Sequence, residues 1–288
     1  MPKLTDISYI KNVLSAFGFT FSKQLGQNFL IDPSVCPKMA ELCGCEGIGV
    51  IEIGPGIGVL TKELSKKAEK VVSIELDKRL EPVLNVTLKD CDNVNVIFGD
   101  AMKLDLSEII KDQFGDMPVV VCANLPYYIT SPLIMQLLES QIDIRAITVM
   151  VQLEAAKRIC AQCGTRECGA VTVAVRAYSD PELLFRVNRG SFMPAPNVDS
   201  AVIKLTLKSA PDIGSTTPKN FTKTVRAAFS QRRKQLANSL SSGLSITKQD
   251  AIKYITDCGL SKTVRAEQLS LCDFKNLSDI IWSDTQNG

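Results

Sequence analysis

A short motif, Asn124-Leu125-Pro126-Tyr127, contains residue types that could act on an exocyclic amine such as adenine N6. That amine is a poor nucleophile because its lone pair is delocalised into the ring. The Asn124 side-chain oxygen and the Leu125 backbone carbonyl, held by the rigid Pro126, could accept the two amine hydrogens and leave the lone pair available. Tyr127 could stack on a base flipped out of its strand, and Phe192 could cover the opposite face of that base.

A glycine-rich loop, residues 54–58 (GPGIG), precedes a helical pattern and is followed by two spaced carboxylates. Glycines such as Gly54 and Gly56 let the backbone approach a ligand closely, and the following helix directs its N-terminus at that ligand. Glu75 closes the next apolar run and could accept both hydroxyls of a ribose. Asp100 follows the third run and could accept an adenine amino hydrogen. Together these positions match three edges of an adenosine.

Two kinds of adenosine cofactor could fit this arrangement. The loop has the spacing GxGxG, whereas the fingerprint of dinucleotide-binding proteins is GxGxxG. Glu52 stands two residues before Gly54, beside the loop, where it would repel a pyrophosphate but suit a ligand with an ammonium and a sulfonium group. The residues therefore favour S-adenosyl-L-methionine over NAD.

The composition excludes several other chemistries. Among 288 residues there is no histidine, so a Ser-His-Asp triad, an HExxH zinc site and a histidine base are all ruled out. The run Cys160-x2-Cys163-x4-Cys168 offers three thiols but no fourth ligand, and we predict no metal there. The ten cysteines are scattered and predict reduced thiols. Neither a membrane span nor a secretory segment is evident, so we expect a cytoplasmic protein.

The elements that must position these residues alternate between strand and helix. This alternation predicts an α/β fold with a doubly wound, mostly parallel sheet. Apolar runs predict buried strands at 49–53, 71–76, 94–98, 119–123 and 146–151, and two final edge strands at 183–187 and 201–207. Helical spacing occurs at 60–68, 133–140 and 153–162. Residues 170–178 fit either a helix or a strand.

A segment rich in Pro, Gly, Ser and Thr, residues 209–218, marks a domain boundary and precedes a helical tail. The net charge of +2 hides an asymmetry, because residues 181–288 carry 15 basic and 9 acidic residues. No acidic residue stands between Asp212 and Asp250. Such a basic stretch favours a polyanion as partner.

Taken in order, the motifs resemble those of the bacterial small-subunit rRNA adenine N6-dimethyltransferase family. The resemblance is carried by residues 24–30, 52–61, 99–101, 124–132, 191–202 and 228–234, and it covers nearly the whole chain. It implies a Rossmann-like, class I S-adenosyl-L-methionine-dependent methyltransferase domain over residues 1–208. A small α-helical RNA- or ribosome-binding domain would follow over residues 209–288.

The implied reaction is the transfer of four methyl groups to two adjacent adenosines in the 3′-terminal hairpin loop of small-subunit rRNA. The substrate would be an immature 30S-type particle, and the enzyme would be monomeric. The resemblance assigns roles as follows: Asn28 and Leu30 line the methionine end, Gly54 and Gly56 form the loop contact, Glu75 holds the ribose, Asp100 holds the adenine, and Asn124 serves both cofactor and amine. Arg226, Arg232, Arg233 and Lys234 would contact RNA phosphates.

Two alternatives stay open at this point. The related large-subunit rRNA methyltransferases of macrolide resistance share the chemistry, although the NLPY form and the match in the tail favour the small-subunit enzymes. A ribosome-assembly factor whose binding matters more than its turnover is the other alternative, although the intact motif set favours activity.

Overall fold

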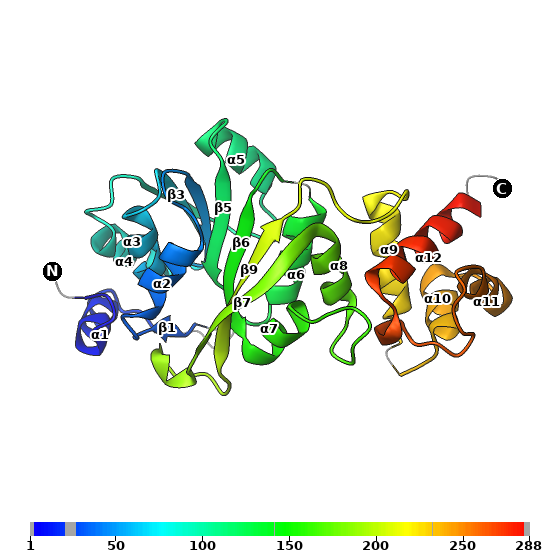
Figure 1. Ribbon diagram of the computed structural model, residues 1–288. Coiled ribbons are helices and arrows are strands. Elements are labelled where there is room, and N and C mark those ends of the chain that lie inside the picture. Colours follow the sequence, from blue (N-terminus) through cyan, green and yellow to red (C-terminus); the bar gives the residue numbers. More distant parts are fainter. Residues whose placement is uncertain (1–2, 21–26, 141, 232, 285–288) are drawn as a thin grey trace. The chain divides into compact units, whose positions relative to one another are not determined.

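The computed structural model describes residues 3–20, 27–140, 142–231 and 233–284. Within them, seven strands form one sheet in the order β4-β3-β2-β5-β6-β9-β7 (Figure 1). The strands are β2 (Gly49–Ile53), β3 (Lys70–Glu75), β4 (Val94–Phe98), β5 (Val119–Asn124), β6 (Ala146–Gln152), β7 (Ser179–Val187) and β9 (Ser200–Leu207). The predicted doubly wound sheet is confirmed, and the two final predicted strands form one end of it, with β7 at the edge and β9 between β7 and β6.

The central strands are parallel and deeply buried. β2 pairs in parallel with both β3 and β5, and all five of its residues are buried. Strands covered on both faces are almost continuously apolar, and the runs GVIEI and VVVCA have this character. Because β2 lies between β3 and β5, the strand order reverses beside it, and such a reversal opens a crevice at the carboxyl ends of the strands.

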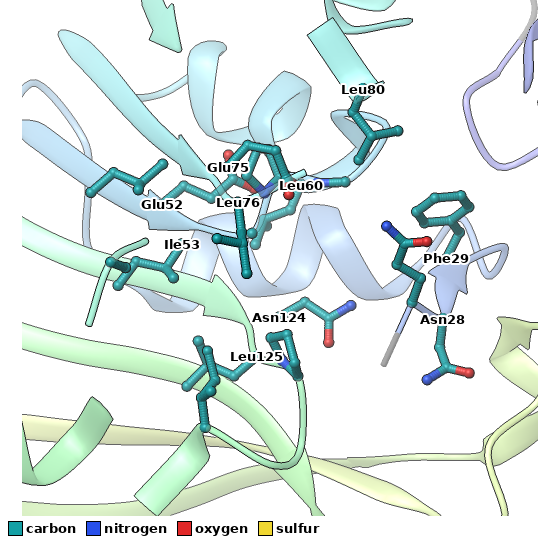
Figure 2. A pocket seen from close by; sticks show the side chains of 18 of the residues that line it. Asn28, Phe29, Glu52, Ile53, Leu60, Glu75, Leu76, Leu80, Asn124 and Leu125 are labelled. Atoms are coloured by element: carbon teal, nitrogen blue, oxygen red, sulfur yellow. Dashed lines mark hydrogen bonds between the residues drawn. The ribbon is translucent and has the colours of Figure 1, made fainter. Parts of the chain in front are cut away.

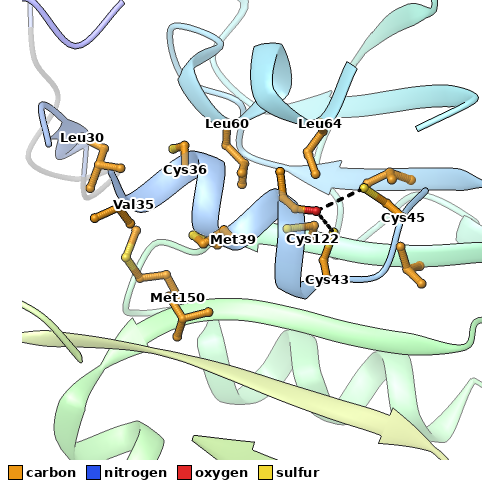
Figure 3. Close-up of a cluster of buried hydrophobic side chains, with 14 of the residues drawn as sticks. Leu30, Val35, Cys36, Met39, Cys43, Cys45, Leu60, Leu64, Cys122 and Met150 are labelled. Atoms are coloured by element: carbon orange, nitrogen blue, oxygen red, sulfur yellow. Dashed lines mark hydrogen bonds between the residues drawn. The ribbon is translucent and has the colours of Figure 1, made fainter. Parts of the chain in front are cut away.

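Helices connect the strands and cover the sheet. They are α1 (Ile7–Ala16), α2 (Val35–Leu42), α3 (Val59–Ser65), α4 (Glu81–Thr87), α5 (Leu106–Phe114), α6 (Thr130–Glu139) and α7 (Leu153–Ile159). Figure 3 shows Cys36 and Met39 of α2 in one buried cluster with Leu60 and Leu64 of α3. Cys122 of β5 belongs to the same cluster, so α2 and α3 share the apolar surface of the sheet.

A two-stranded ladder joins the beginning of the chain to a distant loop. β1 (Phe29–Leu30) pairs antiparallel with β8 (Phe192–Met193), and Leu30 is the register partner of Phe192. The Ile31 N–H donates to the Ser191 carbonyl at 2.8 Å, which extends the connection. Residues 27–32, which we call the N-terminal strap, are therefore tied to the segment that carries Phe192.

The second unit is helical. It contains α8 (Ala170–Tyr178), α9 (Pro218–Ala228), α10 (Leu236–Leu244), α11 (Lys248–Asp257) and α12 (Leu271–Asp284). Phe229 stacks on Phe274 with ring centroids 5.8 Å apart. The Trp282 indole N–H donates to the Thr224 hydroxyl at 2.9 Å, which satisfies two polar groups inside the bundle.

Two features of the helical unit were not decided by the sequence. Residues 170–178, which fitted either a helix or a strand, form helix α8. The helical pattern across 221–240 is divided between α9 and α10, which pack against each other. The basic cluster thus falls in the connection between two helices, because the chain must turn there to bury both apolar faces.

The tertiary contacts divide the chain into two units, one of residues 1–156 with 182–207 and one of residues 157–181 with 208–288. Residues 157–181 therefore group with the helical unit in space. The predicted boundary between a catalytic domain, residues 1–208, and an RNA- or ribosome-binding domain, residues 209–288, concerns function. That boundary stays a proposal. Within the described ranges, no helix is both long and apolar enough to span a bilayer.

The close approach of α9 and α10 gives a test of the helical unit. A Cβ atom at Gly243 of α10 would lie 2.6 Å from the Cα of Ala227 in α9. We expect Gly243→Val to lower the free energy of unfolding of the full chain by about 1–3 kcal/mol, because the helices would have to separate. Urea unfolding measures this change. Ser242→Ala, at the exposed neighbouring position, is the control, and an equal loss in both variants would contradict the packing argument.

Candidate functional site

A cavity of about 230 Å³ lies at the carboxyl ends of the central strands (Figure 2). The loops after β2, β3, β4 and β5 form its floor and walls, and the N-terminal strap and Phe192 complete it. Its lining includes every residue that the sequence assigns to cofactor or amine: Asn28, Leu30, Gly54, Gly56, Glu75, Asp100, Asn124, Leu125, Pro126, Tyr127 and Phe192. The structure thus brings these residues together, while their individual roles stay predictions.

The loop after β2 depends on glycine at every second position. Gly54, Gly56 and Gly58 have φ of 73°, 58° and 87°, which side-chain-bearing residues rarely adopt. A Cβ at Gly56 would lie 3.2 Å from the Phe29 ring of the strap. The bare loop therefore lets the strap approach and leaves backbone facing the cavity.

Glu75 is fixed at the end of β3 by backbone donors. One carboxylate oxygen accepts from the Gly56 N–H at 3.1 Å, and the other accepts from the Asp77 N–H at 2.8 Å. Burial raises the pKa of Glu75, and these backbone bonds oppose that increase. Its carboxylate is therefore held in one orientation beside the glycine loop.

Asp100 occupies the corresponding place after β4. Its carboxylate accepts from the Met102 N–H at 3.0 Å, and the Lys103 ammonium lies 3.5 Å from its other oxygen. Lys103 is largely exposed, so this ion pair adds little stability. Asp100 is thus oriented mainly by its own turn.

Glu52 lies beneath the glycine loop and is almost fully buried. One of its carboxylate oxygens accepts from the Thr61 hydroxyl at 2.6 Å and from the Ser73 hydroxyl at 2.7 Å. Burial raises the pKa of Glu52 to about 7, although both hydroxyls lower it. The floor of the cavity therefore carries an acid that changes charge near neutral pH.

The segment Asn124-Leu125-Pro126-Tyr127, which we call the amide motif, begins at the last residue of β5. Figure 2 shows the Asn124 carboxamide pointing into the open space between the strand ends and the strap that carries Asn28. Leu125 donates its N–H to the Met150 carbonyl at 3.2 Å, which anchors the motif to β6. The Tyr127 hydroxyl is hydrogen-bonded to the Ser200 hydroxyl at 2.9 Å, so the Tyr127 ring is tied to the start of β9.

The strap is anchored at both of its ends. The Gln27 amide donates to Asp77 at 2.8 Å, and the same carboxylate accepts two bonds from the Arg79 guanidinium. At the other end, the Ser191 hydroxyl donates to Asp32 at 3.1 Å. Because Asn28 lies between these anchors, its position depends on both Asp77 and the segment before Phe192.

The charges of the cavity decide which adenosine cofactor it suits. Glu52, Glu75 and Asp100 line it, and its described lining contains neither lysine nor arginine. Such a cavity repels a pyrophosphate and accommodates an ammonium and a sulfonium group. The fold and the cavity therefore define a Rossmann-like, class I methyltransferase that uses S-adenosyl-L-methionine.

Comparison with known proteins agrees with this class and narrows it. The sequence model of ribosomal RNA adenine dimethylase matches residues 18–282. This chain belongs to the ribosomal RNA adenine dimethylase family.

Relatives match along almost the whole chain. The ribosomal RNA small subunit methyltransferase A of Geobacillus thermodenitrificans is 44% identical over 276 residues and covers 94% of both chains. The protein of the same name from Clostridioides difficile is 44% identical over 285 residues and covers 98% of both. A crystal structure of a dimethyladenosine transferase from Plasmodium falciparum has a TM-score of 0.72 at 25% identity, and covers 90% of this chain and 98% of its own.

Three of the predicted RNA-contacting residues, Arg226, Arg233 and Lys234, are not part of the lining of this cavity. Arg226 is in the last turn of α9, and Arg233 and Lys234 are exposed in the connection to α10. Arg232 lies outside the described residues. So do residues 24–26, which begin the first segment of the family resemblance, residues 24–30. The role of these basic residues in RNA binding stays a prediction.

Several residues that shape the cavity were missed from the sequence. Asp77 holds the strap through Gln27, and Ser200 holds Tyr127. In each pair the two residues are distant in the chain. Thr61 and Ser73 hold Glu52 in the same way. The serines and Thr61 are of types that occur everywhere, so only their partners in space reveal them. The sequence QNFL at residues 27–30 could have indicated the strap, because it belongs to the first segment of the family resemblance, residues 24–30.

The three closely spaced cysteines, Cys160, Cys163 and Cys168, lie in the helical unit. A hydrogen bond with Cys168 lowers the pKa of Cys163, and Arg176 acts in the same direction. Cys160, Cys163 and Cys168 are not joined in disulfides. Within the described residues no cluster of three or more metal-binding side chains is assembled, and the expectation that no metal binds stays a prediction.

The raised pKa of Glu52 generates a test by pH. Because the folded chain favours the protonated acid, this stabilisation is complete below pH 4.5 and is lost as pH rises through about 7. Glu52→Gln keeps an acceptor for Thr61 and Ser73 but cannot ionise. We expect the wild-type free energy of unfolding to fall relative to the variant by up to about 3 kcal/mol between these pH values.

Denaturant unfolding at a series of pH values measures this difference. Glu108→Gln, at an exposed position in α5, is the matched control and should follow the wild-type profile. Parallel profiles for wild type and Glu52→Gln would show that Glu52 does not ionise in this range.

Proposed function

We propose that this protein dimethylates N6 of two adjacent adenosines in the 3′-terminal hairpin loop of small-subunit rRNA. The substrate is an immature 30S-type particle in the cytoplasm, and the enzyme acts as a monomer. The observation that carries the proposal is the position of Asn124, which points into a cavity suited to S-adenosyl-L-methionine. Support for the small subunit comes from the names of relatives that match over the full length.

Cofactor binding uses the strand ends and the strap. Glu75 receives the ribose hydroxyls, and Asp100 receives the adenine amine. Asn28 and Leu30 enclose the methionine end, where the backbone at Gly54 and Gly56 allows close approach. When bound, the cofactor supplies a methyl group activated by a sulfonium leaving group.

The target adenine enters between Tyr127 and Phe192. Their rings hold the flipped base, and in the first transfer the Asn124 oxygen and the Leu125 carbonyl accept the two hydrogens of its amine. In the second transfer one methyl group takes the place of one hydrogen, and a single acceptor is used. These acceptors favour a pyramidal nitrogen whose lone pair points at the methyl group. The rate then arises from orientation, which can lower a barrier by about 7–11 kcal/mol. The nitrogen becomes positively charged when it gains the methyl group and then releases one proton to solvent. This proton is acidic, so a strong base is unnecessary, in keeping with a chain that has no histidine.

The helical part of the chain contributes affinity for RNA. We assign catalysis to residues 1–208 and RNA or ribosome binding to residues 209–288. Arg233 and Lys234 are exposed in a stretch without acidic residues, where they meet phosphates without reading sequence. Arg226 and Arg232 extend the same basic stretch along the sequence.

The amine site is tested by Asn124→Ala. We expect methyl transfer from labelled cofactor to unmodified small subunits to fall by a factor of about 100–1,000, because a preorganised acceptor for the reacting amine is lost. Asn95→Ala, at an exposed position of β4, is the matched control. Wild-type methylation by Asn124→Ala would contradict the proposed amine site.

The choice of substrate is tested with the wild-type protein. Unmodified small and large subunits are assayed side by side, and the products are read at each adenosine. We expect dimethylation of two adjacent small-subunit adenosines. Transfer to the large subunit alone would instead indicate an activity like that of the 23S rRNA methyltransferase ErmE, which this chain resembles in fold with a TM-score of 0.65 at 24% identity.

The basic stretch is tested by the salt dependence of binding to small subunits. Replacing Arg233 and Lys234 together by Ala should reduce the slope of log K against log salt by about 2, since each phosphate contact contributes about 1. Lys262→Ala, at another exposed position of the helical unit, is the control. An unchanged slope in the double variant would show that these two residues do not contact phosphate.

A further inference from the structure

The two consecutive tyrosines at residues 127 and 128 differ in how they are held. Tyr127 is half-buried, and its hydroxyl is bonded to the fully buried Ser200. Tyr128 also lines the cavity, but 55% of it is exposed. One ring is therefore fixed inside the site, and the other is presented at its opening.

The exposure of Tyr128 is not explained by the cofactor. Among the described large hydrophobic residues, six are exposed, and Leu76 and Tyr128 are the two that also line the cavity. Leu76 directly follows Glu75, so the proposed ribose site accounts for it. Tyr128 instead directly follows Tyr127, to which the target base is assigned. Its exposed ring is therefore available on the substrate side of the cavity.

The backbone around Tyr128 is fixed before any ligand arrives. The Ile129 N–H donates to the Pro126 carbonyl at 3.2 Å and closes a turn over residues 126–129. The Leu133 N–H then donates to the Ile129 carbonyl at 2.9 Å, which continues the chain into α6. The ring of Tyr128 is therefore carried on a rigid turn, which reduces the entropy lost on binding.

We propose that Tyr128 forms a second base-binding subsite, which stacks the nucleobase adjacent to the target adenine. This inference rests on the proposed function. A neighbouring nucleotide is covalently joined to the target and must leave the cavity through its opening. Tyr128 directly follows Tyr127 in the chain and lines the same cavity, so its exposed ring is within reach of that neighbouring base. Stacking accepts any base, because every base has a π-face.

The test compares three variants on unmodified small subunits, with the KM for subunits and the Kd for S-adenosyl-L-methionine as readouts. Tyr128→Ala should raise the KM about 5- to 150-fold, the range expected for one stacked base, and leave cofactor affinity unchanged. Tyr128→Phe keeps the ring and should recover most of the loss. Phe17→Ala, at an exposed aromatic position outside the cavity, is the matched control and should behave as wild type.

A second substrate identifies what the ring contacts. Small subunits are reconstituted with rRNA in which the nucleotide beside the target is abasic. If Tyr128 stacks on that base, the difference between wild type and Tyr128→Ala should largely disappear on this substrate. The same difference on both substrates would show that the ring contacts another group, such as a ribosomal protein, and would overturn the proposal.

The outcomes separate this inference from the proposed function. If the wild-type protein dimethylates small-subunit adenosines and Tyr128→Ala does so with the same KM, the subsite alone is wrong. If the wild-type protein transfers no methyl group to small subunits, the proposed function itself is wrong. A parallel loss of cofactor affinity in Tyr128→Ala would make Tyr128 part of the cofactor wall and overturn the subsite.

Discussion

Parallel pairing of β2 with both β3 and β5 is the constraint on which the whole site depends. The pairing sets Glu52 opposite Ser73 on one side and opposite Cys122 on the other, so the strands end together. The glycine loop, Glu75 and the amide motif consequently meet at one edge of the sheet. Three chain segments that are far apart in sequence become one cavity because backbone hydrogen bonds fix their register.

That edge is acidic, and the acidity has a cost. Among the residues that the structure describes, Glu52 is buried with two hydroxyl partners and no cation, so its ionised form is disfavoured. Glu75 is in a similar position but is held by backbone N–H groups. A ligand that carries positive charge relieves this cost on binding, whereas a pyrophosphate increases it. The charges of the cavity therefore favour an adenosine cofactor with positive charge over one with a pyrophosphate.

The N-terminal strap makes the two halves of the site depend on each other. Phe29 packs over the glycine loop, and Leu30 pairs with Phe192, which faces the amide motif. A displacement of the strap would therefore disturb the cofactor end and the base end together. Tyr127 is fixed separately, through Ser200 at the start of β9. The two rings proposed to bind the base are thus positioned by two independent connections.

Much of this could be predicted from the sequence by itself. The strands at 49–53 and 94–98 were located from their apolar runs, and Gly54, Glu75, Asp100 and Asn124 from their places after such runs, because a strand's end is a local property. Tertiary structure alone decided that 170–178 is a helix, that the basic tail turns between α9 and α10, and that Asp77 and Ser200 hold the site. Those outcomes depend on contacts between distant segments. A sequence records which residue types are present, but only packing and hydrogen-bond partners in space select among the conformations that they allow.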